Sequence, residues 1–157
     1  MAIEIRVHIE DEVVRRALAD PELVAGPIRR FLNKSALSVE AGAKERAPVD
    51  TGRLRSSITH QVASAEARIG TRLIYAPFVE FGTKPHWPPL RAMQPWARRH
   101  GFPKGNAGAF LVARAIAQHG TKPQPYLRPA LQASLPDVRR FLEDAAKEIE
   151  GRWSRHG

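Results

Sequence analysis

The sequence predicts an α+β fold, in which a small, mostly antiparallel β-sheet is packed by a long N-terminal helix and an amphipathic C-terminal helix. Strand-like alternation is confined to short segments, and apolar residues at helical spacing begin at Ile28 and again at Val138. The chain has 157 residues, the size of one domain. We therefore expect a single domain over residues 1–157.

The N-terminal third predicts a strand followed by helices. Residues 3–9 alternate strictly between apolar and polar side chains, which is the pattern of a half-buried strand, and residues 11–19 predict a short helical segment. Apolar residues then recur every three or four positions, which predicts a helix over residues 28–46. Pro27 suits the first position of this helix, and Pro48 ends it because it disfavours the α conformation in the preceding residue.

A turn and a hairpin are expected next. Residues 49–55 predict a turn in which Gly52 supplies a positive φ and Asp50 accepts backbone N–H groups. Alternating residues over 56–62 and 67–71 predict the two strands of a hairpin.

Residues 84–122 combine basic charge, many prolines and helical spacing. The spacing predicts two short helices, over residues 90–100 and 107–118. The apolar side of the second helix is expected to consist of Phe110, Leu111 and Ile116. We expect this region to be a basic helical insertion in the domain.

The C-terminal segment carries the clearest helical pattern. Its prolines predict an extended, stiff stretch over residues 121–129. After Pro136, apolar residues recur at helical spacing from Val138 to Trp153, which predicts an amphipathic helix.

Charge is distributed unevenly along the chain. Lys and Arg total 25 against 16 Asp and Glu, which gives a net charge of +9 at pH 7. No acidic residue lies between Glu80 and Asp137, and every Lys and Arg of that stretch occurs over residues 84–128. Such a block favours an acidic partner surface or a phosphate backbone.

The motifs give no support to an enzyme. Cysteine is absent, which excludes a disulfide framework and a thiol nucleophile. Asp50-Thr51-Gly52 is similar to the aspartic-protease signature, but Arg53 and Arg55 would hold Asp50 ionised, so a turn is the better interpretation. The histidines lack the spacing and the neighbouring carboxylates of a metal site. We expect no catalytic residue, no cofactor, no metal and no membrane-spanning segment.

Nucleic-acid binding by the acid-free residues 84–128 is the alternative function. The two short helices would then form a helix-turn-helix whose basic side chains contact phosphates. The second helix offers only one Arg and one Gln for reading bases. A basic insertion that covers the sheet is therefore favoured over sequence-specific recognition.

Three segments in a fixed order resemble a known family. They are residues 47–58 (APVDTGRLRSSI), 75–83 (YAPFVEFGT) and 123–131 (PQPYLRPAL). Across about residues 31–146, the chain resembles the tail-component family of long-tailed bacteriophages. That family includes tail-completion and head–tail joining proteins similar to minor tail protein Z of phage lambda.

The resemblance implies a virion structural protein rather than an enzyme. It implies a ring-forming tail-completion subunit at the neck, assembled in the host cytoplasm and located finally in the virion tail. The implied partners are copies of the chain itself, a hexamer being expected in preference to a dodecamer, and other phage tail or connector proteins. The basic residues would contact DNA without sequence preference in the lumen of the ring.

The first motif segment supplies candidate structural residues. Asp50 and Gly52 are expected to shape the turn, whereas Arg53 and Arg55 are expected to pair with an acid on a partner or with Glu80.

The other segments supply candidate packing and interface residues. Tyr75, Phe78 and Phe81 are expected to close the sheet over the long helix. Tyr126 and Arg128 are expected to anchor an interface. The full candidate set is Asp50, Thr51, Gly52, Arg53, Leu54, Arg55, Tyr75, Phe78, Glu80, Phe81, Gly82, Thr83, Trp87, Pro125, Tyr126, Leu127, Arg128 and Pro129.

Overall fold

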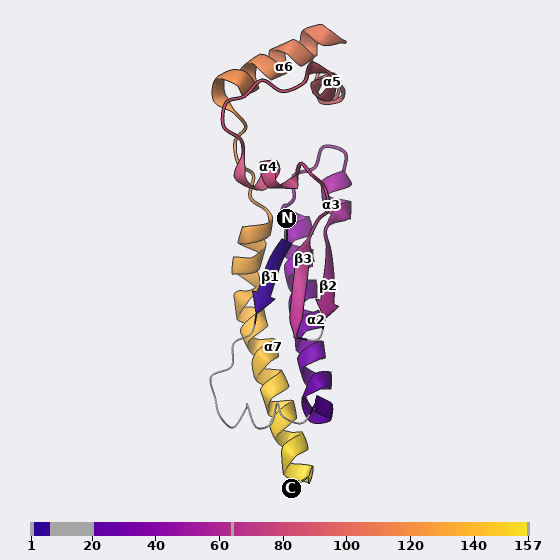
Figure 1. Cartoon of the computed structure of the whole chain (residues 1–157), viewed down its shortest axis with the longest axis vertical. Helices are drawn as coiled ribbons and strands as arrows, with labels where there is room; N and C mark the ends of the chain where they lie inside the picture. Colours follow the sequence, from indigo (N-terminus) through magenta and orange to yellow (C-terminus); the bar gives the residue numbers. More distant parts are fainter. Residues whose placement is uncertain (1, 7–20, 64, 157) are drawn as a thin grey trace. The chain divides into compact units, whose positions relative to one another are not determined.

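A computed structural model describes residues 2–6, 21–63 and 65–156. The elements in chain order are β1 (Ala2–Arg6), α2 (Pro21–Arg46), α3 (Arg53–Ser57), β2 (Thr59–Ala63), β3 (Glu66–Gly70), α4 (Ala76–Phe81), α5 (Leu90–Arg99), α6 (Asn106–His119) and α7 (Leu127–His156) (Figure 1). The predicted helical segment over 11–19, and the predicted strand beyond Arg6, lie outside the described residues.

The chain divides into two compact units. The sheet unit comprises Met1–Ala76 and Pro125–Gly157, and the basic unit comprises Pro77–Gln124. The predicted insertion over residues 84–122 lies inside the basic unit.

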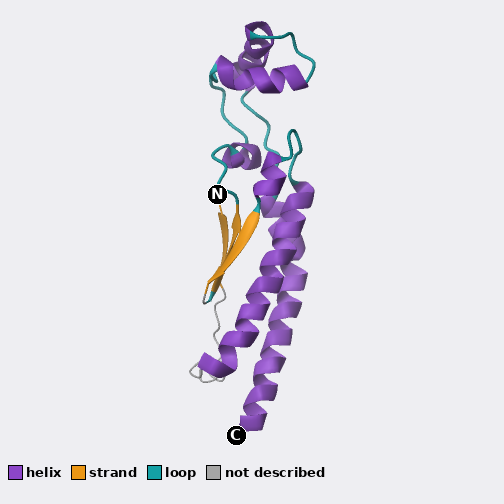
Figure 2. Cartoon of the chain, turned by 90° about the vertical axis from the view of Figure 1, so that its right-hand side faces the viewer, coloured by secondary structure: helices purple, strands orange, loops and turns teal. Residues whose placement is uncertain are grey.

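The sheet unit has the predicted α+β architecture. Its three strands are antiparallel in the order β1-β3-β2, with Ile3 opposite Ile69 and Val62 opposite Ala67. The helices α2 and α7 pack side by side, and α2 also packs against β2 and β3 (Figure 2). Ala67 and Ile69 of the central strand are completely buried.

Helix α2 contributes more buried apolar residues to this unit than any other element does. It ends at Arg46, as Pro48 predicts, but it begins at Pro21, so Pro27 lies inside the helix and not at its first position. An internal proline removes one backbone N–H, and Pro27 is nevertheless accommodated as a buried residue. The buried apolar residues on α2 are Val24, Phe31, Leu32, Ala36, Val39 and Ala43.

Helix α7 begins earlier than predicted. The expected extended stretch over 121–129 is wrong from Leu127 onward, and Pro136 lies inside the helix instead of before it. Pro129 falls in the first turn, where a backbone N–H has no intrahelical acceptor, so a proline there costs little.

The first strand of the predicted hairpin also begins later than expected. Residues 53–57 form α3, and β2 starts only at Thr59. The hydroxyls of Ser56 and Ser57 donate hydrogen bonds to the carbonyls of Arg53 and Leu54, at 3.1 and 2.8 Å. Such local bonds offer serine an alternative to a strand ladder.

The basic unit contains the two predicted short helices, α5 and α6, packed against each other. The predicted apolar side of α6 is wrong. Phe110 and Leu111 are exposed, and Ile116 is only partly buried. The residues that α6 buries are small: Gly108, Ala109, Val112 and Ala113. The chain passes so close to α6 that a Cβ added at Gly108 would lie 2.1 Å from the carbonyl oxygen of Pro103, and a large side chain would not fit there.

Candidate functional site

The first motif segment forms a turn that leads into α3. Gly52 has a φ of 77°, as predicted for this turn, and precedes the first helical residue. The carbonyl of Gly52 accepts a bond from the N–H of Ser56 at 3.0 Å. Leu54 is buried, whereas Arg53 and Arg55 are exposed. Their pairing with an acid remains a prediction.

Hydroxyl groups tie α3 to the end of β3. The side chains of Ser57 and Thr71 are hydrogen-bonded at 2.7 Å, and the N–H of Leu73 donates to Oγ1 of Thr71 at 3.1 Å. Thr71 is buried. These bonds fix the path of the chain on both sides of the hairpin.

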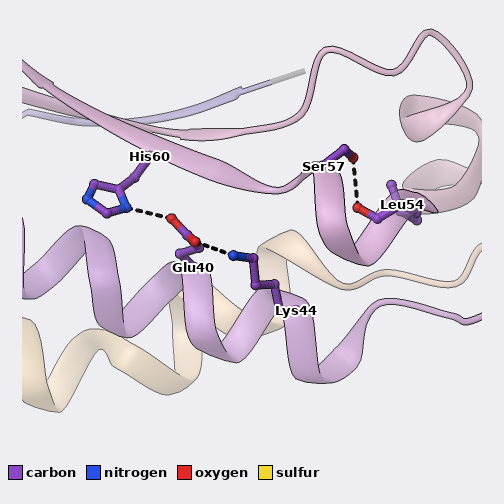
Figure 3. A network of polar contacts seen from close by, with 5 residues as sticks. All are labelled: Glu40, Lys44, Leu54, Ser57 and His60. Atoms are coloured by element: carbon purple, nitrogen blue, oxygen red, sulfur yellow. Dashed lines mark hydrogen bonds and ion pairs between the residues drawn. The ribbon is translucent and has the colours of Figure 1, made fainter. Parts of the chain in front are cut away.

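A carboxylate network joins β2 to α2 (Figure 3). Glu40 accepts a hydrogen bond from Nζ of Lys44, and its Oε2 lies 2.5 Å from Nδ1 of His60. Burial alone would raise the pKa of Glu40, but the hydrogen bonds and charges of Lys44 and His60 outweigh it, so the pKa is lowered. Sequence reasoning missed this network, although the i, i+4 spacing of Glu40 and Lys44 is a visible signal.

The second motif segment ends in a clasp, which we define as Gly82, Thr83, Gly120 and Thr121. The backbones of Thr83 and Thr121 exchange two hydrogen bonds, at 3.1 and 3.2 Å, and their hydroxyls are hydrogen-bonded at 3.1 Å. An added Cβ at Gly82 would lie 2.4 Å from the carbonyl oxygen of Thr121, and one at Gly120 would lie 2.0 Å from that of Thr83. The clasp therefore closes the two ends of the α5–α6 segment upon each other.

The aromatic residues of this segment do not close the sheet. Tyr75, Phe78 and Phe81 are all exposed, which corrects the sequence-based expectation. The reason is the conformation: residues 76–81 form a short helix whose buried positions are Ala76 and Glu80, at i and i+4.

The third motif segment divides between the core and the surface. Tyr126 and Leu127 are completely buried, whereas Arg128 is exposed. A completely buried Tyr126 is not available to a partner, so its expected role as an interface anchor is corrected to a role in the core. The corresponding role of Arg128 remains a prediction.

The surface of the basic unit is cationic and aromatic. Its one carboxylate, Glu80, is buried. Trp96 stacks on His100 with ring centroids 3.9 Å apart. The exposed cations are Lys84, Arg91, Arg98, Arg99, Lys104, Arg114 and Lys122. Arg98 and Lys104 also line an open pocket of about 260 Å³.

Two further findings concern other kinds of site. Among the described residues, no group of three or more His, Asp or Glu side chains is placed to hold a metal ion. None of the helices in the described ranges has the apolar length needed to cross a bilayer.

Two signals in the sequence bear on what was missed. The dipeptide Gly-Thr occurs at both halves of the clasp, at residues 82–83 and 120–121, but also at residues 70–71, so this repetition does not by itself predict the pairing. The small residues of α6 are a second signal, because they favour close helix packing on that side.

Comparison with known proteins gives one match. Residues 12–82 match the family model described as "HK97-gp10_like: Bacteriophage HK97-gp10, putative tail-component". This match supports the bacteriophage tail-component family that the motif segments resemble, over a region that contains the first segment and nearly all of the second. No curated protein matches the chain, and no solved structure matches it.

Proposed function

We propose that this chain, whose residues 12–82 match a bacteriophage tail-component family model, is a ring-forming subunit that completes the tail at the neck, where the head joins. The family match is the observation that carries the proposal. The proposed ring is a hexamer, related in role to minor tail protein Z of phage lambda. It is assembled in the host cytoplasm, stays in the virion and acts by binding, without turnover.

The contrast between the two units supports this proposal. A closed head-to-tail ring needs two different, complementary patches on each subunit. The sheet unit contains exposed carboxylates and the basic unit contains none. One chain thus carries two surfaces of different chemistry.

The test is the native mass of the purified chain, alone and co-expressed with the tail-tube and connector proteins of the same phage. We expect a hexameric ring and co-purification with one of these proteins. An Arg128→Ala variant should assemble less well if this exposed residue anchors an interface. A chain that stays monomeric with and without these partners, and is absent from purified virions, would contradict the proposal.

Binding of nucleic-acid phosphates is a second candidate function. The observation that favours it is the basic unit, whose Lys and Arg side chains are all exposed while its carboxylate is buried. Each phosphate contact should add about 0.9 to the slope of log K against log salt concentration. Replacing Arg98 and Lys104 by Gln should reduce that slope for duplexes of any sequence. The absence of binding to duplex DNA at low salt would remove this candidate.

A further inference from the structure

Helix α6 buries its small residues and exposes its large ones. Phe110 is 45% exposed and Leu111 is 47% exposed. Trp87 is 54% exposed and sets its ring against Phe110, with the centroids 5.6 Å apart and the planes at 63°. Arg114 lies one turn beyond Phe110 and is exposed. We define these four residues as the α6 face. An exposed aromatic cluster beside a cation is typical of an interaction surface.

Helix α7 exposes a surface with the opposite charge. At about 100° per residue, Leu135, Glu143, Glu150 and Trp153 fall within about 80° of the helix circumference. Leu135 is 43% exposed and Trp153 is 46% exposed. Glu143 and Glu150 are exposed, and within the described part of the chain neither forms an ion pair. These four residues are the α7 face; Arg139 lies among them, and Arg128, also exposed, lies about two turns before Leu135 within the same arc.

We infer that the α6 face of one copy docks on the α7 face of a neighbouring copy. Both faces combine large apolar groups with charge, and the charges are complementary: Arg114 would approach Glu143 or Glu150, while the aromatic pair covers Leu135 or Trp153. The contact joins two different surfaces, so it repeats head to tail around a ring. This inference rests on the proposed ring and names the surfaces that form it.

A second copy explains the α6 face better than DNA does. Phosphate contacts come from charged and polar groups, which would leave Trp87, Phe110 and Leu111 without a function. A neighbouring α7 provides partners for the apolar residues as well as for the arginine. Duplex DNA is accordingly an outcome that the experiment must distinguish.

The experiment uses charge reversal in the full chain. One preparation carries Arg114→Glu, and a second carries Glu143→Lys together with Glu150→Lys. Each preparation places like charges opposite each other where two identical copies meet. Each should therefore weaken self-association roughly tenfold or more at about 0.1 M salt. Mixing the two preparations should restore assembly, because every contact between alternating copies then joins opposite charges. Sedimentation or native mass measures the outcome, with circular dichroism to check folding.

The controls are two reversals outside the faces. Lys122→Glu changes an exposed cation of the basic unit, and Asp144→Lys changes an exposed carboxylate of α7 that lies about 100° from Glu143. Both controls should assemble like the unsubstituted chain.

The outcomes separate this inference from the proposed function. If the unsubstituted chain forms a ring and the face variants form it equally well, the inference fails and the ring stands. If the unsubstituted chain stays monomeric, both fail. The inference would be overturned if the face variants and the controls lost self-association equally, or if mixing the two face variants did not restore it. It would also be overturned if Arg114→Glu abolished binding to duplex DNA and left self-association unchanged.

Discussion

The sheet unit buries several large apolar side chains, whereas helix α6 of the basic unit buries only small ones. In the sheet unit, Phe31, Ile69 and Tyr126 are completely buried. In the basic unit, Phe110 and Trp87 remain about half exposed, and α6 buries only small residues. Burial of apolar area contributes roughly 25 cal/mol per Å². The sheet unit therefore uses Phe31, Ile69 and Tyr126 for its own stability, whereas the basic unit leaves Phe110 and Trp87 available to a partner.

Charged groups follow the same division. In the sheet unit, Glu40 is bonded to Lys44 and His60, and Glu148 accepts bonds from Arg30 at 2.5 Å and from Arg152 at 2.8 Å. The basic unit exposes no carboxylate of its own beside its cations. The sheet unit pairs several of its charges internally, and the basic unit presents a surface whose exposed charges are cations.

The largest expected effect tests the packing of the sheet unit. Phe31→Ala removes a completely buried ring, and we expect it to lower the free energy of unfolding by about 3–5 kcal/mol. The matched control is Leu37→Ala on the same helix, whose side chain is exposed and whose effect should stay within about 0.5 kcal/mol. Denaturant unfolding followed by circular dichroism measures both. Similar losses in the two variants would contradict the assignment of the core.

The next effect should be confined to the basic unit. Gly120 has a φ of 68°, and an added Cβ would meet the carbonyl oxygen of Thr83 at 2.0 Å. We expect Gly120→Ala to lower the free energy of unfolding of the basic unit by about 3 kcal/mol or more, because backbone strain and a clash act together. Gly105→Ala is the control: its backbone has a similar glycine-only conformation, with φ 73° and ψ −144°, but nothing lies within 4 Å of the added Cβ. Only the strain, about 1–3 kcal/mol, is therefore expected there.

Amide hydrogen exchange shows which part of the chain Gly120→Ala destabilises. Gly120→Ala should reduce protection over residues 83–121 while the protection of α2 and β3 is unchanged. Loss of protection throughout the chain would show that the two units unfold together, and the comparison between them would then not hold.

Local rules predicted the longer helices α2, α5, α6 and α7 and the end of α2, but they missed the short helices α3 and α4. Periodicity located α5 and α6 because they are short amphipathic segments between prolines and glycines. Pro48 predicted the end of α2 correctly, because a proline disfavours the α conformation in the residue directly before it, whatever the tertiary structure. The start of α7 was missed because a proline has a different effect in a first turn than in a helix interior, and the sequence does not show where the first turn begins.

The candidate site depended more on tertiary structure. Periodicity shows that α6 has two different sides, but the close approach of Pro103 to Gly108 decides which side packs. The clasp joins residues 38 positions apart, beyond the range of any local pattern. Tyr126 was expected to anchor an interface, yet it is completely buried within the sheet unit.

A smaller effect concerns the polar network of the sheet unit. The folded-state pKa of Glu40 is lowered from the usual value of 4.5. Its contribution to stability is therefore fully present above that value and is lost as the pH falls through the lower folded-state pKa. We expect Glu40→Gln to lower the free energy of unfolding by about 1–2 kcal/mol at pH 7.

The lowered pKa of Glu40 also predicts how the stability difference between the two chains changes with pH. The difference between the unsubstituted chain and Glu40→Gln should shrink as the pH falls below 4.5, as measured by denaturant unfolding at several pH values. Glu143→Gln, at an exposed carboxylate without an ion pair among the described residues, is the control and should change stability little at pH 7. A Glu40→Gln difference that is constant down to acidic pH would contradict the proposed role of the network.

The smallest expected effect on stability sharpens the comparison most, because it separates folding from binding. Phe110→Ser removes an aromatic ring that is already about half exposed and that packs edge-to-face against Trp87. The free energy of unfolding should therefore fall by less than about 1 kcal/mol. Self-association of the same variant should weaken by roughly 30-fold, the loss typical of an aromatic residue central to an interface. Unfolding and sedimentation of one preparation measure both quantities. A large loss of stability would place Phe110 in the core of the basic unit, and unchanged self-association would leave its exposure without the function that we infer.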